Sequence, residues 1–178
     1  APGQKYLRGL YCGGTLGYEA LTVLGNRIGP VYSNVASKPE LRLKDPWSSH
    51  QHSIVDLGED EFTRGRAHPM IDPELRGRRL LAETDDPSVA VLLLDVVLGY
   101  GSHPNPAGAL EEPIRQAKRK AEAAGRYLAV VASVCGTEAD PQGLAGQEAA
   151  LVEAGAVVMS SNAQAVRLAG AIARLARS

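Results

Sequence analysis

The chain has 178 residues, of which 44% are apolar and 22% are charged, so one domain of ordinary size can bury a substantial core. Its 19 basic and 20 acidic side chains give a formal net charge of -1, which offers no electrostatic reason to expect nucleic acid or an anionic membrane surface as a partner. No apolar run approaches the length of about 18 residues that a membrane span needs, and no leader pattern is visible, so we expect a cytoplasmic protein.

Apolar runs alternate with segments of helical spacing along the chain. Residues 1–4 are typical of a linker and the first residue is not Met, so we expect residues 1–178 to be a single domain cut from a longer protein. The predicted strands are 6–12, 30–35, 53–57, 89–98, 127–135 and 156–159. The predicted helices run from the 13–17 turn to about 24, closed by Gly25-Asn26, and over 73–84, 107–124, 144–154 and 163–177, the last capped by Ser161, with an inserted loop at 37–51.

The run 89–98 is the clearest strand, because it is aliphatic apart from Asp95 and one alanine, as a strand buried on both faces must be. Alternating strands and helices predict an α/β fold with three layers, a parallel sheet covered by helices on both faces. Five main strands fit the flavodoxin-like order 2-1-3-4-5, with 53–57 second and 89–98 third. Ligands then bind beyond the carboxyl ends of strands 1 and 3, where loops 13–17 and 99–108 are expected to line one pocket.

Glycines and small polar residues in these loops are the candidate anion-binding groups. Free N–H groups at a helix N-terminus bind phosphate or carboxylate, and glycine lets the ligand approach closely. The other interpretation of the first loop is a tight turn that needs glycine for its geometry. The candidate binding residues are Gly13, Gly14, Thr15, Gly99, Tyr100, Gly101 and Asn105, together with Gly136 and Thr137 from the loop that follows the predicted strand 127–135.

Histidine supplies the candidate catalytic group. His103 lies in the predicted crevice loop beside Asn105, where an imidazole can act as a base, a nucleophile or a hydrogen-bond donor to an anion, although an exposed loop histidine is the alternative. His68 follows two arginines that could hold a phosphate, but we favour a solvated polar loop there. His50 and His52 lack further ligands at metal-binding spacing, so we predict no metal site.

Three remaining side chains are predicted from burial. An unpaired carboxylate inside an apolar strand is costly, so Asp95 must either accept a hydrogen bond from a loop N–H or line the pocket. Cys12 and Cys135 end strands that the predicted order separates by about 10 Å, which is too far for a disulfide. We expect both to be buried, reduced thiols.

Four blocks of sequence, at 7–20, 56–72, 94–104 and 132–138, together resemble the FdrA family over nearly the whole chain. FdrA proteins are similar to the NDP-forming acyl-CoA synthetases, of which succinyl-CoA synthetase is the familiar member. The resemblance implies a flavodoxin-like CoA-ligase domain. It also implies that a CoA-binding-like half of the same protein, or partner subunits in a homo- or hetero-oligomer, works with this domain, and that CoA or a nucleotide binds through that remainder.

The same resemblance suggests a reaction. Succinyl-CoA synthetase passes phosphate through a histidine in a Gly-His-Ala-Gly motif, and the nearest equivalent here has Gln147 in place of the histidine. Either this domain corresponds to the partner domain without the nucleophile, or the family uses no phosphohistidine. FdrA proteins have been tied to carbamoyl transfer between carbamoyl phosphate and oxamate or oxalurate in purine and allantoin breakdown.

Two functions follow as hypotheses. In the first, the domain acts on an acyl or carbamoyl phosphate and a small carboxylate, with positioned N–H groups stabilising charge and His103 donating a proton. In the second, the domain is a docking or CoA- or nucleotide-binding module whose crevice only completes the site of a partner. Replacement of His103 should lower turnover in the first case alone.

Overall fold

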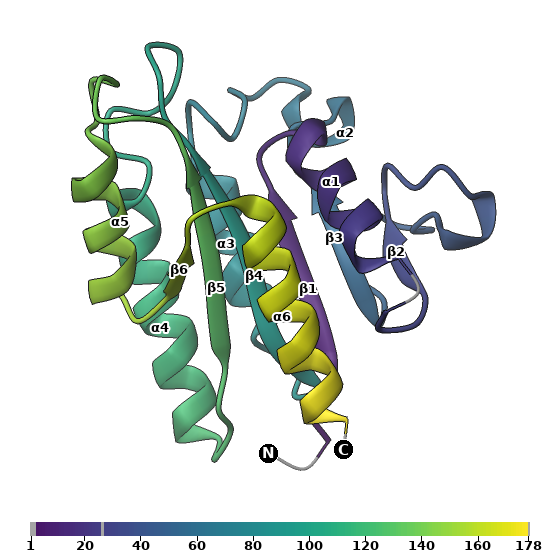
Figure 1. Ribbon diagram of the computed structural model, residues 1–178. Coiled ribbons are helices and arrows are strands. Elements are labelled where there is room, and N and C mark those ends of the chain that lie inside the picture. Colours follow the sequence, from purple (N-terminus) through teal and green to yellow (C-terminus); the bar gives the residue numbers. More distant parts are fainter. Residues whose placement is uncertain (1–2, 26, 178) are drawn as a thin grey trace.

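A computed structural model describes residues 3–25 and 27–177 (Figure 1). Its centre is a parallel six-stranded sheet in the order β2-β3-β1-β4-β5-β6. The strands are β1 (Tyr6–Tyr11), β2 (Val31–Ser33), β3 (His52–Asp56), β4 (Val89–Val97), β5 (Ala129–Cys135) and β6 (Val157–Met159). The predicted order of the five main strands is therefore confirmed, and the short strand predicted at 30–35 adds β2 at one edge. Ala1 and Pro2 of the predicted linker, and Asn26 of the predicted helix end, lie outside the described residues.

Helices cover both faces of the sheet, as the alternating pattern predicts (Figure 1). One apolar cluster joins α1 and α6 to the sheet, and the other joins α3, α4 and α5 to its opposite face. The helices are α1 (Gly14–Leu24), α2 (Asp60–Thr63), α3 (Glu74–Glu83), α4 (Gly108–Ala123), α5 (Leu144–Glu153) and α6 (Asn162–Ala176). The short α2 was not predicted, because its four residues are too few to show a helical period. No helix in the described ranges has the length and apolarity needed to cross a membrane.

Local sequence signals explain where these helices begin. Asp72 accepts a hydrogen bond from the Glu74 N–H at 3.0 Å, just before α3. Ser161 caps α6 as predicted, with its hydroxyl accepting from the Gln164 N–H at 3.3 Å. Strand β4 is buried from Val89 through Val96, which confirms the central strand expected from its aliphatic sequence.

The insertion between β2 and β3 is tied firmly to α3. Its chain forms a parallel bridge from Arg42 to Ser33, which extends the sheet edge, and it contains the 3-10 turn η1 (Pro39–Leu41). Arg79 of α3 donates to the Pro46 carbonyl at 3.0 Å and to the Ser49 hydroxyl at 2.8 Å, while its Nε lies 2.7 Å from Glu83. The predicted loop is thus an ordered part of the fold.

Candidate functional site

The loops after β4 and β5 meet at the carboxyl edge of the sheet. The Leu98 N–H donates to the Cys135 carbonyl at 2.9 Å, and the side chain of Gln142 bonds both the N–H and the carbonyl of Gly99, at 3.0 and 2.8 Å. Gly136 is required here, because a Cβ at this position would lie 2.6 Å from the Leu98 side chain. Two of the predicted binding loops are therefore locked together.

His103 occupies a fixed position in the β4–α4 loop. Its N–H donates to the Met70 carbonyl at 2.8 Å, and its own carbonyl accepts from Gln142 at 3.2 Å. Its Nδ1 accepts from the Asn105 N–H at 3.0 Å, so the proton of the neutral ring is on Nε2. The half-buried imidazole can therefore donate a hydrogen bond through Nε2.

Gln147 caps the N-terminal end of α4 from a neighbouring helix. Its Oε1 accepts from the Ala107 N–H at 2.9 Å, and its amide nitrogen donates to Asn105 Oδ1 at 3.1 Å. Asn105 Oδ1 also accepts from the Gly108 N–H. A neutral amide thus satisfies the helix terminus that an anion could otherwise occupy.

Several predicted anion donors already have partners. The N–H groups of Gly99 and Asn105 bond Gln142 and His103, and the Thr137 N–H lies 2.6 Å from the Asp140 carboxylate. Tyr100 is 93% exposed, and Gly101 is exposed beside it. This part of the predicted anion site is therefore better suited to holding its loop in place than to binding phosphate.

The turn between β1 and α1 keeps the features of an anion site. Gly13 precedes the first helical residue in an extended conformation, and no described side chain caps α1. Gly13, Gly14 and Thr15 are at least partly accessible. Of the predicted binding residues, these three form the strongest candidate site, because a helix N-terminus without a cap attracts negative charge.

Asp95 lies directly beneath this turn and is paired, as the first of its two interpretations requires. Its carboxylate accepts from the Cys12 N–H at 3.0 Å and from the Cys12 thiol at 3.1 Å. Arg76 Nη2 lies 2.9 Å from the same carboxylate. Asp95 therefore fixes the end of β1 below the candidate site.

The two thiols differ in their surroundings. Both are free, with β4 between their strands, but Cys12 is buried while Cys135 is exposed, which corrects the prediction of two buried thiols. The pairing of β5 with β6 ends at Ser133 and Met159, so the end of β5 extends beyond the shorter strand β6. Burial and the nearby Asp95 charge raise the pKa of Cys12 well above its usual value.

A second group of residues near the β1–α1 turn was missed by the sequence interpretation. Asp56, at the end of β3, is 2% exposed, and its Oδ1 accepts from the Gly58 N–H at 2.8 Å. His68 is half-buried against Gly58, where its Nε2 would lie 2.6 Å from an added Cβ, whereas residues 64–67 before it are exposed, as the prediction of a solvated loop requires. Because the backbone at 58 must pass so close to an imidazole, the glycine was the available sequence signal.

The other two histidines lie at the amino end of β3. His52 is buried, its Nδ1 accepts from the Leu7 N–H at 3.1 Å, and burial lowers its pKa to about 4. His50 is exposed and packs edge-on against the Tyr32 ring. Within 3–25 and 27–177, no group of three or more His, Cys, Asp or Glu side chains is arranged to hold a metal ion.

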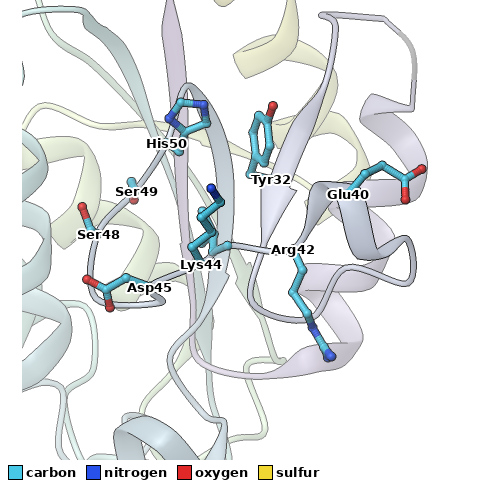
Figure 2. Close-up of a pocket in the computed structure, with 9 residues that line it drawn as sticks. Tyr32, Glu40, Arg42, Lys44, Asp45, Ser48, Ser49 and His50 are labelled. Atoms are coloured by element: carbon cyan, nitrogen blue, oxygen red, sulfur yellow. The ribbon is translucent and has the colours of Figure 1, made fainter.

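A surface cavity of about 500 Å³ lies beside β2, away from the predicted crevice (Figure 2). Figure 2 shows Lys44 pointing toward Tyr32 and His50, while Glu40 and Arg42 turn away from them. None of the predicted binding residues lines this cavity.

Comparisons with known proteins agree with the fold. A family model described as CoA-ligase matches residues 10–172. The uncharacterized protein YahF of Escherichia coli (strain K12) is 48% identical over 161 residues, which are 90% of this chain and 31% of YahF. The chain therefore spans about a third of the length of this relative.

Proposed function

The chain belongs to the CoA-ligase family, and from that membership we propose that it is one domain of a longer, cytoplasmic enzyme that acts on an acyl or carbamoyl phosphate. The uncapped N-terminus of α1 at Gly13, Gly14 and Thr15 is the observation that carries this proposal. Backbone N–H groups there would hold the phosphate, and a CoA-binding-like domain or partner subunit would complete the site.

The acceptor that we propose is a small carboxylate. An oxamate- or oxalurate-type molecule would accept the carbamoyl group, as the resemblance to FdrA proteins implies. Gln147 supports direct transfer, because this neutral side chain cannot form a phosphorylated intermediate of the histidine kind, and transfer from an acyl phosphate needs no such nucleophile.

His103 is the proposed proton donor to the departing or developing anion. Only Nδ1 of His103 accepts the hydrogen bond from the Asn105 N–H, so Nε2–H can donate to a ligand without breaking that bond. The orientation of its ring therefore suits His103 to donate a proton. Hydrogen bonds of Gly99, Asn105 and Thr137 stabilise the loops around it.

The test uses the full-length protein that contains this domain, with its partner subunits. Phosphate release from carbamoyl phosphate and acetyl phosphate would be measured with oxamate as acceptor. We expect His103→Ala to lower kcat by about 100-fold, and His103→Asn, which can keep the hydrogen bond from Asn105, to lower it similarly. His50→Ala is the matched control and should leave kcat unchanged.

A docking or CoA- or nucleotide-binding module is the alternative. The cavity beside β2 favours it, because Lys44 and the Tyr32 ring together suit a planar, anionic ligand. Under this alternative all three histidine variants retain the turnover of the full-length protein. Calorimetric titration with CoA and ATP would then give heat, which Lys44→Ala abolishes.

A further inference from the structure

Asp56 has a buried carboxylate with one oxygen facing the β1–α1 turn. Its side chain is 2% exposed, and Oδ1 accepts from the Gly58 N–H. Oδ2 lies 3.2 Å from the point where a Cβ on Gly14 would stand, and no residue in the described ranges donates a hydrogen bond to it. One oxygen of a buried carboxylate thus has no hydrogen-bond donor among the described residues, and it lies beside a helix N-terminus that no described side chain caps.

The surrounding residues hold this carboxylate in place. Asn34 accepts from the Asp56 N–H at 3.0 Å and donates to its carbonyl at 2.9 Å. A Cβ added to Gly58 would lie 2.6 Å from His68 Nε2 and 3.1 Å from Asp56 Oδ1, so both side chains pack against this glycine. Because His68 Nδ1 accepts from the Met70 N–H, the neutral ring carries its proton on Nε2, on the side of Asp56.

The charges around Asp56 favour proton uptake. Burial raises the pKa of Asp56, with further increases from the charges of Glu59 and Asp95, while the Gly58 N–H and His68 act in the opposite direction. Asp95 is itself paired with Arg76, and Cys12 beside it stays a neutral thiol. A carboxylate that binds its proton more readily than usual is suited to accept one from a substrate.

We propose that Asp56 accepts the proton of the attacking nucleophile during group transfer at the β1–α1 turn. This role depends on the proposed function. The nucleophile, an N–H or O–H group, forms a bond to the acyl or carbamoyl carbon, and the carbon–oxygen bond to phosphate breaks. Phosphate leaves with the bonding electron pair and is held at the α1 N-terminus, and the proton of the nucleophile passes to Asp56 Oδ2.

The protonation state of Asp56 should also change the affinity of the β1–α1 turn for an anion that undergoes no reaction. An ionised carboxylate next to the α1 N-terminus repels an anion, whereas a protonated one can donate a hydrogen bond to it. Anion affinity at the turn should therefore rise as the pH falls and Asp56 takes up a proton. Sulfate is the suitable probe, because it keeps both of its negative charges while the pH is lowered through the titration of a carboxylate.

Two measurements on the full-length protein test the assignment. Asp56→Asn, which retains an oxygen acceptor for the Gly58 N–H, is compared with Asp60→Asn, an exposed acid on α2. We expect Asp56→Asn to lower kcat by about 100-fold or more and to remove most of the rise in sulfate affinity that the wild type shows as the pH is lowered. Asp60→Asn should change neither, and far-ultraviolet circular dichroism checks that each variant is folded.

Glu59→Gln gives an independent test that leaves the carboxylate in place. Since the Glu59 charge raises the pKa of Asp56, this variant should move the midpoint of the sulfate pH dependence to lower pH. Equal sulfate profiles for the wild type, Asp56→Asn and Glu59→Gln would overturn the role of Asp56, as would an unchanged kcat in Asp56→Asn. If the wild type transfers no group but its sulfate profile depends on Asp56, the proposed function fails while the protonation of Asp56 at the turn stands.

Discussion

Arg76 reaches from α3 to the carboxylate of Asp95 on β4, with 2.9 Å between Nη2 and Oδ1 and with side chains that are only 4% and 1% exposed. The same Nη2 donates to the carbonyls of Leu10 and Asp95, at 2.9 and 2.7 Å. One guanidinium thus ties α3 to β1 and β4, directly below the candidate anion site.

Replacing Arg76 should be strongly destabilising. Arg76→Met leaves the Asp95 carboxylate buried without its cation, and we expect the free energy of unfolding to fall by about 3–5 kcal/mol. Arg78→Met on the same helix is the control, since its pair with Glu74 is exposed at 3.6 Å and contributes at most about 1 kcal/mol. Urea unfolding measures both, and equal effects would contradict the assigned role of the buried pair.

Gly136 and Gly146 offer a matched pair of substitutions. Gly136→Ala would place a Cβ 2.6 Å from Leu98, and the forced shift should cost about 1–3 kcal/mol. Gly146→Ala, inside α5 with nothing within 4 Å, should instead stabilise the fold by about 0.5–1 kcal/mol. Thermal unfolding gives the two signs, and a stabilising Gly136→Ala would show that the loops after β4 and β5 are not closely packed.

His52 should make stability depend on pH. Its pKa is about 4 in the folded protein, below the usual value of 6.5, so the unfolded chain binds a proton first as the pH falls. The stability that depends on neutral His52 is therefore complete above about pH 6.5 and is lost progressively toward about pH 4. His52→Gln should show a smaller loss between about pH 7 and about pH 5 in urea unfolding, whereas His50→Gln should behave like the wild type.

The two cysteines should react at very different rates. Cys135 is exposed, while Cys12 is buried and its thiol donates to Asp95. An aromatic disulfide reagent should modify Cys135 rapidly in the native protein and reach Cys12 only after unfolding in denaturant. The variant Cys135→Ser should show no rapid phase, and a rapid phase that persists in this variant would contradict the burial of Cys12.

Sequence periodicity was sufficient to predict the main strands and their covering helices, and the fit of five such strands to the flavodoxin-like order then gave their arrangement, which the structure confirms. It could not predict the contact of His68 with Gly58. That contact depends on how the segment after α2 folds back over the sheet edge, and this path leaves no periodic signal. The exposure of Cys135 was missed for a related reason, since it depends on β6 being shorter than β5.

The ties from Arg79 to Pro46 and Ser49 make the insertion a cooperative part of the domain. If the segment opened, Arg79 would lose Pro46 and Ser49 as partners and Glu83 would lose the Ser49 hydroxyl, so opening carries a penalty that an ordinary surface loop does not have. Its protected amides should therefore exchange with solvent together with those of α3. Deleting the segment should accordingly weaken the whole fold, so its length is constrained by the core that it helps to close.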